Sequence, residues 1–359
     1  MSSIYGEKLK LSIFGQSHGP AIGMTLDGIP AGLPVDEEYL RIFLTRRAPG
    51  NSEYTTSRKE TDHLEFLSGI VNGYTCGAPI TAVIQNHDIH SADYEARKHI
   101  PRPGHADYTA GIKYGGFQDV SGGGHFSGRL TAPLCIAGGL CKQWLERTDI
   151  HIGAHIIQVG NTSCDTFDPV HPQLDQIGHI FPTLTAETAE AFQAEIASAK
   201  SMQDSVGGRI ECAVTGLPAG LGSPMFGGVE SRIAQIVYGI PAVKAIGFGS
   251  GQKLASMLGS ESNDAFTIDC GTVVTESNHC GGILGGITNG MPVIFDVTFK
   301  PTPSIGKPQQ TVNVMTGNIT TIQIDGRHDP CIVPRAVPVV EAAAALAVLD
   351  MILESNGGL

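Results

Sequence analysis

The chain has 359 residues, of which 41% are hydrophobic and 16% charged, and its formal net charge is −12. This composition is typical of a folded globular protein with a large core, and it excludes a low-complexity or disordered chain. An acidic chain also lacks the excess of Lys and Arg that a general nucleic-acid or anionic-membrane surface needs. Any anionic ligand must therefore bind in a local basic pocket.

The cellular compartment is predicted from features that the sequence lacks. No apolar run approaches the roughly eighteen residues of a membrane span, and the N-terminus has no basic-then-apolar signal pattern. We therefore expect a cytoplasmic protein that does not enter a membrane. The eight cysteines are scattered without a Cys-x-x-Cys pair or a metal-ligand spacing. They predict reduced, mostly buried thiols, no disulfide and no bound metal.

Two strands are predicted near the N-terminus, at 8–14 and 22–29, where apolar residues partly alternate with polar or small ones. The connection between them is Gly15-Gln-Ser-His-Gly-Pro20, which places Ser17 and His18 between glycines at a strand end. A tight turn with a solvated His and a rigid loop with a catalytic His fit this pattern about equally.

A helix is predicted after Asp36, which can cap it, with Leu40 and Leu44 on its apolar face. Its last turn holds Arg46 and Arg47. Basic residues at a helix C-terminus usually lie on a solvated surface, where they interact with the helix dipole. We expect this outcome for both arginines unless another feature recruits them.

The stretch with the most chemistry lies between 102 and 129. It holds Arg102-Pro-Gly-His-Ala-Asp-Tyr-Thr109 and then Gly122-Gly-Gly-His-Phe-Ser-Gly-Arg129. Three glycines in a row suggest a loop where the main chain approaches a ligand closely or takes a positive φ. A mobile loop is the commoner meaning of such a run, so both interpretations stay open.

The other elements are predicted from hydrophobic periodicity. Helices are expected at 131–147, 186–200, 229–238 and 341–354, and strands at 81–84, 150–159, 209–214, 243–248 and 292–299. The strand at 150–159 should be half-buried, because its apolar residues alternate. The order of elements has no βαβ rhythm, and no linker or repeat divides the chain. We therefore predict one mixed α/β or α+β domain over residues 1–359.

Two further segments carry functional residue types. Lys300-Pro-Thr-Pro-Ser304 follows a predicted strand, and a Lys with neighbouring hydroxyl groups can hold a phosphate, although a surface Lys is commoner. Gly326-Arg-His-Asp-Pro-Cys331 is a predicted turn in which Arg327 and Asp329 could share a face. Neither a Walker-type loop nor a Gly-x-Gly-x-x-Gly dinucleotide motif is present.

Taken together, the motifs resemble the chorismate synthase family, in the family's order from about residue 6 to residue 350. The segments that carry the resemblance are Phe14-Gly-Gln-Ser-His-Gly-Pro20, Thr45-Arg-Arg-Ala-Pro-Gly50, Thr55-Thr-Ser-Arg-Lys-Glu60, Arg102-Pro-Gly-His-Ala-Asp-Tyr-Thr109, Gly122–Gly124, Gly281–Gly286 and Gly326–Cys331. The resemblance implies a single α+β domain with helices sandwiched between antiparallel β-sheets, usually in homotetramers.

The resemblance also implies a function. Members of the family are lyases that convert 5-enolpyruvylshikimate 3-phosphate to chorismate and phosphate by 1,4-anti-elimination, in the shikimate pathway to aromatic amino acids. They need reduced FMN although the reaction has no net redox change. We therefore expect a cytoplasmic, homotetrameric flavoprotein whose partner is a small phosphorylated substrate.

The family match assigns roles to residues. His18 resembles the general acid toward the departing phosphate, His105 the group that sets the flavin's protonation, and Asp329 the carboxylate that relays a proton from flavin N5. The positions matched or expected to bind substrate are Ser17, Arg47, Arg129 and Arg335. The positions expected to bind flavin are His125, Phe126, Ser127, Ala242, Gly285, Lys300, Pro301, Thr302, Pro303, Ser304 and Arg327.

The chain departs from the family pattern at a few positions. His125 and Phe126 replace an Arg and a Ser near the flavin, which removes a fixed cation and a hydroxyl donor. Glu53 stands where an Arg is usual, so the sequence does not decide whether the protein contacts reduced nicotinamide (NADP). Two alternatives therefore accompany the lyase: a paralogue that binds FMN or a phosphorylated acid without elimination, and an enzyme for another phosphorylated cyclohexene acid.

Overall fold

The computed structural model describes residues 3–50, 62–86, 98–324 and 329–356. Three of the sequence features discussed above lie outside these ranges: Glu53, the segment 55–60 and Arg327. Residues 87–97, which precede Arg102 in the chain, also lie outside them.

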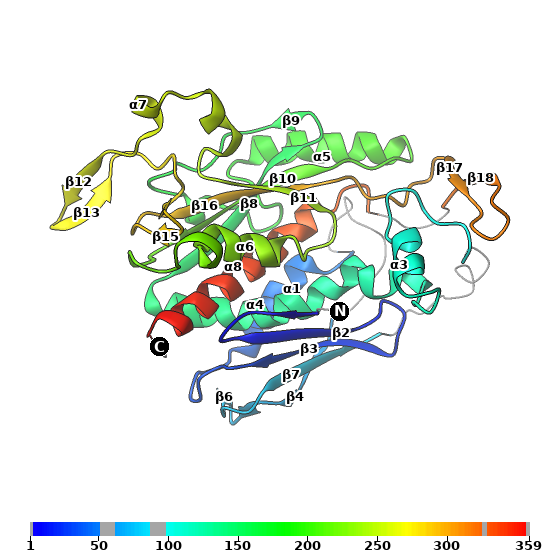
Figure 1. The fold of residues 1–359 in the computed structure, drawn as a ribbon, viewed down its shortest axis with the longest axis horizontal. Coiled ribbons are helices and arrows are strands. Elements are labelled where there is room, and N and C mark those ends of the chain that lie inside the picture. The colour runs from blue at the N-terminus through cyan, green and yellow to red at the C-terminus, as the bar shows by residue number, and fades with distance from the viewer. Residues whose placement is uncertain (1–2, 51–61, 87–97, 325–328, 357–359) are drawn as a thin grey trace.

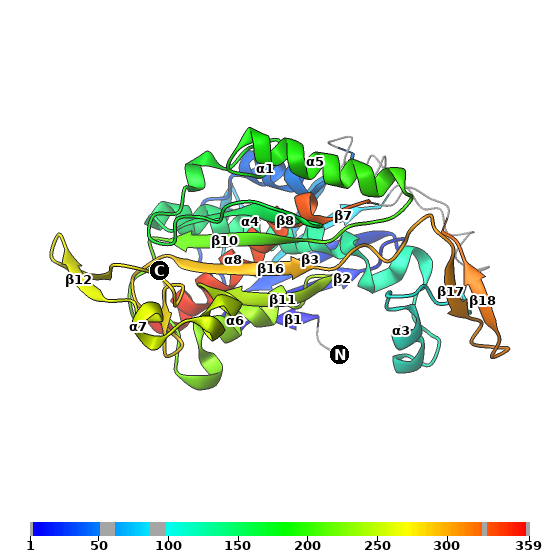
Figure 2. The same ribbon diagram turned by 90° about the horizontal axis from the view of Figure 1, so that it is seen from above.

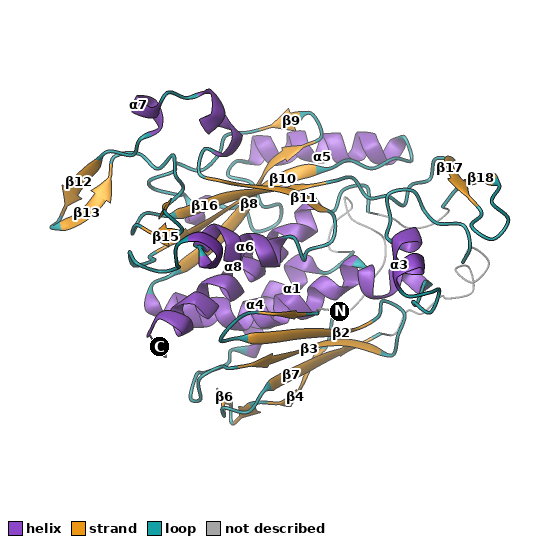
Figure 3. Ribbon diagram, in the orientation of Figure 1, coloured by secondary structure: helices purple, strands orange, loops and turns teal. Residues whose placement is uncertain are grey.

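Two five-stranded antiparallel sheets form the frame of the molecule (Figures 1 and 3). The first sheet has the order β1 (Ile4–Tyr5), β2 (Lys10–Gly15), β3 (Ala21–Asp27), β7 (Ile80–Gln85) and β4 (Leu64–Ser68). The second has the order β11 (Val243–Phe248), β16 (Val293–Phe299), β10 (Gly208–Thr215), β8 (His151–Val159) and β9 (Thr162–Ser163).

Helices fill the space between the two sheets, as Figure 1 shows. They are α1 (Glu37–Arg47), α4 (Thr131–Leu145), α6 (Val229–Val237) and α8 (Val333–Asn356). The close packing of α4 on α8 depends on small residues, because a Cβ at Gly138 would lie 2.3 Å from the Cβ of Ala342. The expected α+β sandwich of helices between antiparallel sheets is therefore confirmed.

The helix α8 differs most from its prediction. It begins at 333 rather than 341. Pro334 is tolerated because it lies in the first turn, where a backbone N–H would have no helical partner, and the helix continues through Pro338. With this extension it is long and apolar enough to cross a membrane, contrary to the expectation that no run would be. Its most apolar stretch is entirely buried inside the protein, so α8 is the central core helix.

The strand β8 is buried on both faces, so the half-buried prediction was wrong. Helix α8 covers one face, and α5 (Ala186–Ser201) lies on the other side of the second sheet (Figures 1 and 2). His155, on the face expected to be solvated, is completely buried, and its ring lies 4.2 Å from the ring of Phe167. The alternation in the sequence could not show this, because the covering residues come from later segments.

The remaining elements are short. The other helices are α3 (Asp107–Lys113) and α7 (Gly259–Ser262), and small hairpins are formed by β5 (Ile70–Val71) with β6 (Tyr74–Thr75), β12 (Phe266–Asp269) with β13 (Thr272–Thr275), β14 (Ile283–Leu284) with β15 (Ile287–Thr288), and β17 (Gln309–Val312) with β18 (Ile319–Ile322). Short 3-10 segments lie at Ser121–Phe126, Gly128–Leu130, Glu146–Thr148, Leu174–Gln176, Met225–Gly227 and Gly251–Ser256.

The cysteines are free thiols, but only four of the eight are buried: Cys135, Cys141, Cys212 and Cys331. Cys76 and Cys270 are exposed. The expectation of mostly buried thiols therefore holds for half of them.

Candidate active site

A cavity of about 600 Å³ is lined by residues from both halves of the chain. Its walls come from the β2–β3 connection, the end of α1, the segments 102–106 and 122–131, the turn before β11, the end of β16 and the start of α8. Six of the described lining residues are cations: Arg47, Arg102, Arg129, Lys244, Lys300 and Arg335. Among the same described residues, Asp329 is the one carboxylate. The acidic protein thus has the local basic pocket that an anionic ligand requires.

Most of the residues predicted from the sequence meet in this cavity. Those that line it are Ser17, Arg47, His105, His125, Phe126, Ser127, Arg129, Ala242, Lys300, Thr302, Pro303, Ser304, Asp329 and Arg335. His18 and Pro301 adjoin lining residues in the chain but do not line the cavity themselves. Gly285 lies in the turn between β14 and β15, at the opposite end of the molecule from α3 (Figure 1), so the structure does not bring it to the cavity.

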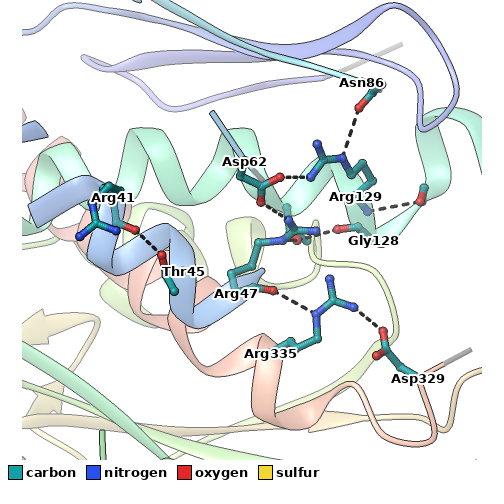
Figure 4. A network of polar contacts seen from close by, with 11 residues as sticks. Arg41, Thr45, Arg47, Asp62, Asn86, Gly128, Arg129, Asp329 and Arg335 are labelled. Atoms are coloured by element: carbon teal, nitrogen blue, oxygen red, sulfur yellow. Dashed lines mark hydrogen bonds and ion pairs between the residues drawn. The ribbon is translucent and has the colours of Figure 1, made fainter. Parts of the chain in front are cut away.

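Asp62 bridges two of the arginines, as Figure 4 shows. One carboxylate oxygen lies 2.7 Å from a terminal nitrogen of Arg47, and the other pairs with a terminal nitrogen of Arg129. Arg47 is only 2% exposed, and its burial lowers the pKa of the guanidinium despite the ion pair with Asp62. Arg47 therefore lies at the cavity, to which the family match assigns it, and not on the solvated surface that a helix C-terminus alone suggests. Its neighbour Arg46 makes a two-pronged ion pair with Glu341 of α8.

Arg335 joins this group to the expected catalytic carboxylate. Its Nε donates a hydrogen bond of 3.0 Å to the carbonyl oxygen of Arg47, and a terminal nitrogen pairs with the carboxylate of Asp329 (Figure 4). Asp329 is thereby held at the start of α8, beside the arginines and facing the same cavity. A carboxylate held in this position has the chemistry of a proton acceptor.

His105 belongs to a second polar group, which comes from one short segment. Its Nδ1 lies 2.6 Å from a carboxylate oxygen of Asp107, and Arg102 donates two hydrogen bonds from its guanidinium to the same carboxylate. Burial opposes the ionisation of Asp107, but these hydrogen bonds outweigh it and hold the pKa of the carboxyl well below its usual range. The sequence prediction overlooked Asp107 and Arg102, although both flank His105 in the same motif.

The glycine triplet lies against both histidine rings. Gly122, Gly123 and Gly124 all have positive φ, between 54° and 87°. A Cβ at Gly122 would lie 2.5 Å from Nε2 of His18, and one at Gly123 would lie 3.2 Å from Nε2 of His105. The triplet is therefore a close approach of the main chain to two side chains.

The segment after β16 has the chemistry expected of a phosphate site. Ser304 is buried, and its Oγ lies 3.4 Å from a terminal nitrogen of Arg102. The Oγ1 of Thr302 is buried and has no hydrogen-bond partner among the described residues. Burial and the nearby charge of Lys244 lower the pKa of Lys300. An anion at this position would relieve the repulsion between the two lysines and give Thr302 an acceptor.

The comparisons with known proteins agree with this arrangement of residues. The family model for chorismate synthase matches residues 9–353. This chain belongs to the chorismate synthase family. It is 45% identical to the chorismate synthase of Lancefieldella parvula over 99% of both chains, and 43% identical to that of Korarchaeum cryptofilum over 99% of this chain and 98% of the relative. A crystal structure of a chorismate synthase covers 98% of this chain and 94% of its own, with 30% identity and a TM-score of 0.79.

Chorismate synthases use reduced FMN, and the residues of this cavity fit such a cofactor. A volume of about 600 Å³ lies within the usual range of cofactor sites, and Lys300, Thr302 and Ser304 offer a cation and hydroxyl groups for the FMN phosphate. Among the residues that the structure describes, no cluster of His, Cys, Asp and Glu has the arrangement of a metal site.

His125 differs from the arginine that is usual in chorismate synthases, and the structure shows what it does instead. Its Nδ1 lies 2.8 Å from the carbonyl oxygen of Gly15, and its Nε2 lies 2.9 Å from Oγ of Ser3. Because a carbonyl only accepts, Nδ1 carries the proton and Nε2 is free to accept from Ser3. His125 thus ties the cavity wall to the N-terminal strands.

Proposed function

We propose that this chain converts 5-enolpyruvylshikimate 3-phosphate to chorismate and phosphate with reduced FMN, as a chorismate synthase of the shikimate pathway. The observation that carries the proposal is one basic cavity in an acidic protein, in which four arginines, His105 and Asp329 face the same space. Such a site suits a substrate with several negative charges whose reaction needs proton transfers.

Reduced FMN, when bound, supplies the electron density that lets the substrate lose its phosphate and a poorly acidic ring hydrogen. In our proposal Lys300, Thr302 and Ser304 bind its phosphate group. The positions His125, Phe126, Ser127, Ala242, Pro303 and, by family match alone, Pro301 and Arg327 complete the cofactor wall. We leave Gly285 out of this set because it lies away from the cavity.

The substrate's anionic groups bind to Arg47, Arg129 and Arg335, with Ser17 as a hydroxyl donor at the edge of the cavity. Arginine suits this task because its planar guanidinium can donate two parallel hydrogen bonds to a carboxylate or phosphate. Asp62, which now pairs with Arg47 and Arg129, is their internal counterion. An incoming dianion therefore competes with Asp62 for the two guanidinium groups.

Three groups manage protons. His18 donates a proton from its imidazolium to the departing phosphate, and it lies directly against Gly122 of the cavity wall. Nε2 of His105 holds or releases a proton next to Gly123. Asp329 takes up a proton at its carboxylate, which the contact with Arg335 holds in place.

The domain organisation, oligomeric state and cellular compartment of the protein are inferred as well. The large hydrophobic core cluster draws its residues from Leu9 to Leu353 and from both sheets, which supports one domain over residues 1–359. By family resemblance we infer a homotetramer in the cytoplasm. Size-exclusion chromatography with light scattering would test the assembly, and a monomer at micromolar concentration would contradict it.

The activity is tested by an anaerobic assay with 5-enolpyruvylshikimate 3-phosphate and chemically reduced FMN, in which phosphate and chorismate are followed together. We expect both products in equal amounts, and only with reduced flavin. Neither product, from a folded protein that still binds FMN, would favour a non-catalytic paralogue. Phosphate release from a different phosphorylated cyclohexene acid would instead show an altered substrate.

A further inference from the structure

The carboxylate of Asp107 accepts all of the hydrogen bonds described here from one short segment of the chain. Asp107 is the first residue of α3, and its side chain turns back to accept hydrogen bonds from Arg102 and His105. Arg102 contributes its backbone N–H at 3.0 Å, its Nε at 2.7 Å and a terminal nitrogen at 2.8 Å. His105 contributes Nδ1 at 2.6 Å. The three side chains are between 13% and 19% exposed, so little water competes for these bonds.

This geometry decides which nitrogen of His105 carries the proton. An oxygen and a nitrogen 2.6 Å apart cannot both be acceptors, because their lone pairs would repel. Asp107 is ionised and can only accept, so Nδ1 must donate. The guanidinium of Arg102 also lies 3.1 Å from Nδ1, but it too is only a donor and has the carboxylate as its partner. Nε2 is therefore the nitrogen of the neutral ring that can exchange a proton.

Nε2 is also the nitrogen that faces the reaction space. It lies next to Gly123, and His105 lines the cavity. The charged groups around the ring are Asp107 and Arg102 on its own segment, with Lys300 from the end of β16 bonded to the carbonyl of Gly104. Arg102 balances the charge of Asp107 through their ion pair.

We propose that Asp107 is the positioning residue of His105: it holds the Nδ1 proton, fixes the ring orientation and so presents Nε2 to the cavity, with Arg102 locking the carboxylate in place. The inference rests on the proposed proton-handling role of His105. It goes beyond that role, because it names the group that makes a particular nitrogen of His105 the reactive one. Removing the carboxylate should leave the ring in place, but the proton should no longer be confined to Nδ1.

The test is ¹⁵N NMR of histidine-labelled protein, with the His105 signals identified by their absence from the His105→Gln variant. In the wild type we expect the neutral ring to be protonated at Nδ1. In Asp107→Asn we expect a substantial population protonated at Nε2, because the amide can donate to Nδ1. A wild-type ring protonated at Nε2 would overturn the proposal, as would a tautomer that Asp107→Asn leaves unchanged. The wild-type measurement decides even if the variant fails to fold.

Kinetics supply the second arm. Asp107→Asn should lower kcat on the order of a hundredfold, the usual size of a lost proton-transfer arrangement. The double variant with His105→Gln should be no slower than His105→Gln alone. Multiplicative losses would show that Asp107 acts independently of His105 and would contradict the proposal. The matched control is Asp36→Asn, which also removes a charge at a helix N-terminus but keeps a good cap. If the wild type has the Nδ1 tautomer but no lyase activity, the proposed function fails while the positioning stands.

Discussion

The imidazole of His18 lies directly against the main chain of Gly122, so that a Cβ at residue 122 would be 2.5 Å from its Nε2. Residue 122 also has a φ of 59°, which residues with a side chain rarely adopt. The neighbouring Ser17 donates its backbone N–H to the carbonyl of Gly124 at 3.0 Å. The first histidine motif and the glycine triplet therefore form one unit, although a hundred residues of sequence separate them.

This contact predicts the effect of Gly122→Ala. The methyl group must displace the His18 ring, since the main chain around it is held by Ser17, so we expect turnover to fall at least on the order of a hundredfold. FMN binding should change little by comparison. The control is Gly259→Ala, where the structure shows open space around the added methyl group. Wild-type turnover in Gly122→Ala would mean that the exact place of His18 does not matter.

The layers of the fold could be predicted because each element has its own local signal. Apolar periodicity located the predicted strands and helices to within two residues, apart from the start of α8, and Asp36 caps its helix as expected, with its carboxylate 2.9 Å from the N–H of Tyr39. The start of α8 was missed because Pro334 and Pro338 suggest a helix boundary when tertiary packing is unknown. Burial of the second face of β8 depends on α5, which no periodicity within β8 reports.

The site was predicted less completely, because its partners are set by tertiary structure. The motifs identified His105 and Asp329, but nothing in the sequence indicates that Asp62 pairs with Arg129, 67 residues further along the chain. The position of Arg47 at a helix C-terminus suggests a solvated surface, and only the family match assigned it to the cavity that it lines. Asp107 was also overlooked, but here the sequence held a signal, because a carboxylate two residues after His105 could have suggested a pair.

Asp62→Asn should increase the affinity of the cavity for anions and lower the stability of the protein. Asp62 and Arg47 are each 3% exposed at the side chain, and removing one partner of a buried pair typically costs about 3–5 kcal/mol. Inorganic phosphate should then raise the melting temperature of the variant more than that of the wild type, since it replaces the lost charge. The control is Asp204→Asn, which breaks an exposed pair with Lys307. If phosphate raised the melting temperatures of Asp62→Asn and of the wild type equally, Asp62 would not compete with anions.

Asp350 anchors the N-terminal segment to the core helix, so Asp350→Ala should be strongly destabilising. Its carboxylate is fully buried and accepts the backbone N–H groups of Glu7, Lys8 and Leu9 and one guanidinium nitrogen of Arg232. We expect a loss of about 3–5 kcal/mol in the free energy of unfolding, measured by urea denaturation. Glu354→Ala, which removes the half-exposed partner of the same arginine, should change it by less than about 1 kcal/mol.

The lowered pKa of Asp107 predicts a pH dependence of stability. A carboxyl whose pKa in the folded protein lies below its unfolded value of about 3.9 stabilises the fold above that pH, and this contribution is lost as the pH falls through the folded pKa. Asp107→Asn should therefore lower the free energy of unfolding at pH 5–7, and its difference from the wild type should shrink below about pH 4. A difference that stays constant from pH 7 to pH 3 would contradict this assignment.

His125 offers a direct test of how this chain accommodates the loss of the usual arginine. His125→Arg introduces a permanent cation at the cavity wall. A hydrogen bond from a charged group is worth about 1.5–3 kcal/mol, so FMN should bind roughly ten- to a hundredfold tighter. The same change removes the bond from Nδ1 to the carbonyl of Gly15. His125→Gln separates the two effects, because it removes the imidazole without adding charge. Fluorescence titration with FMN gives both affinities. If Arg weakens binding while Gln does not, the pocket has been rebuilt around a neutral side chain, and the added charge is unfavourable there.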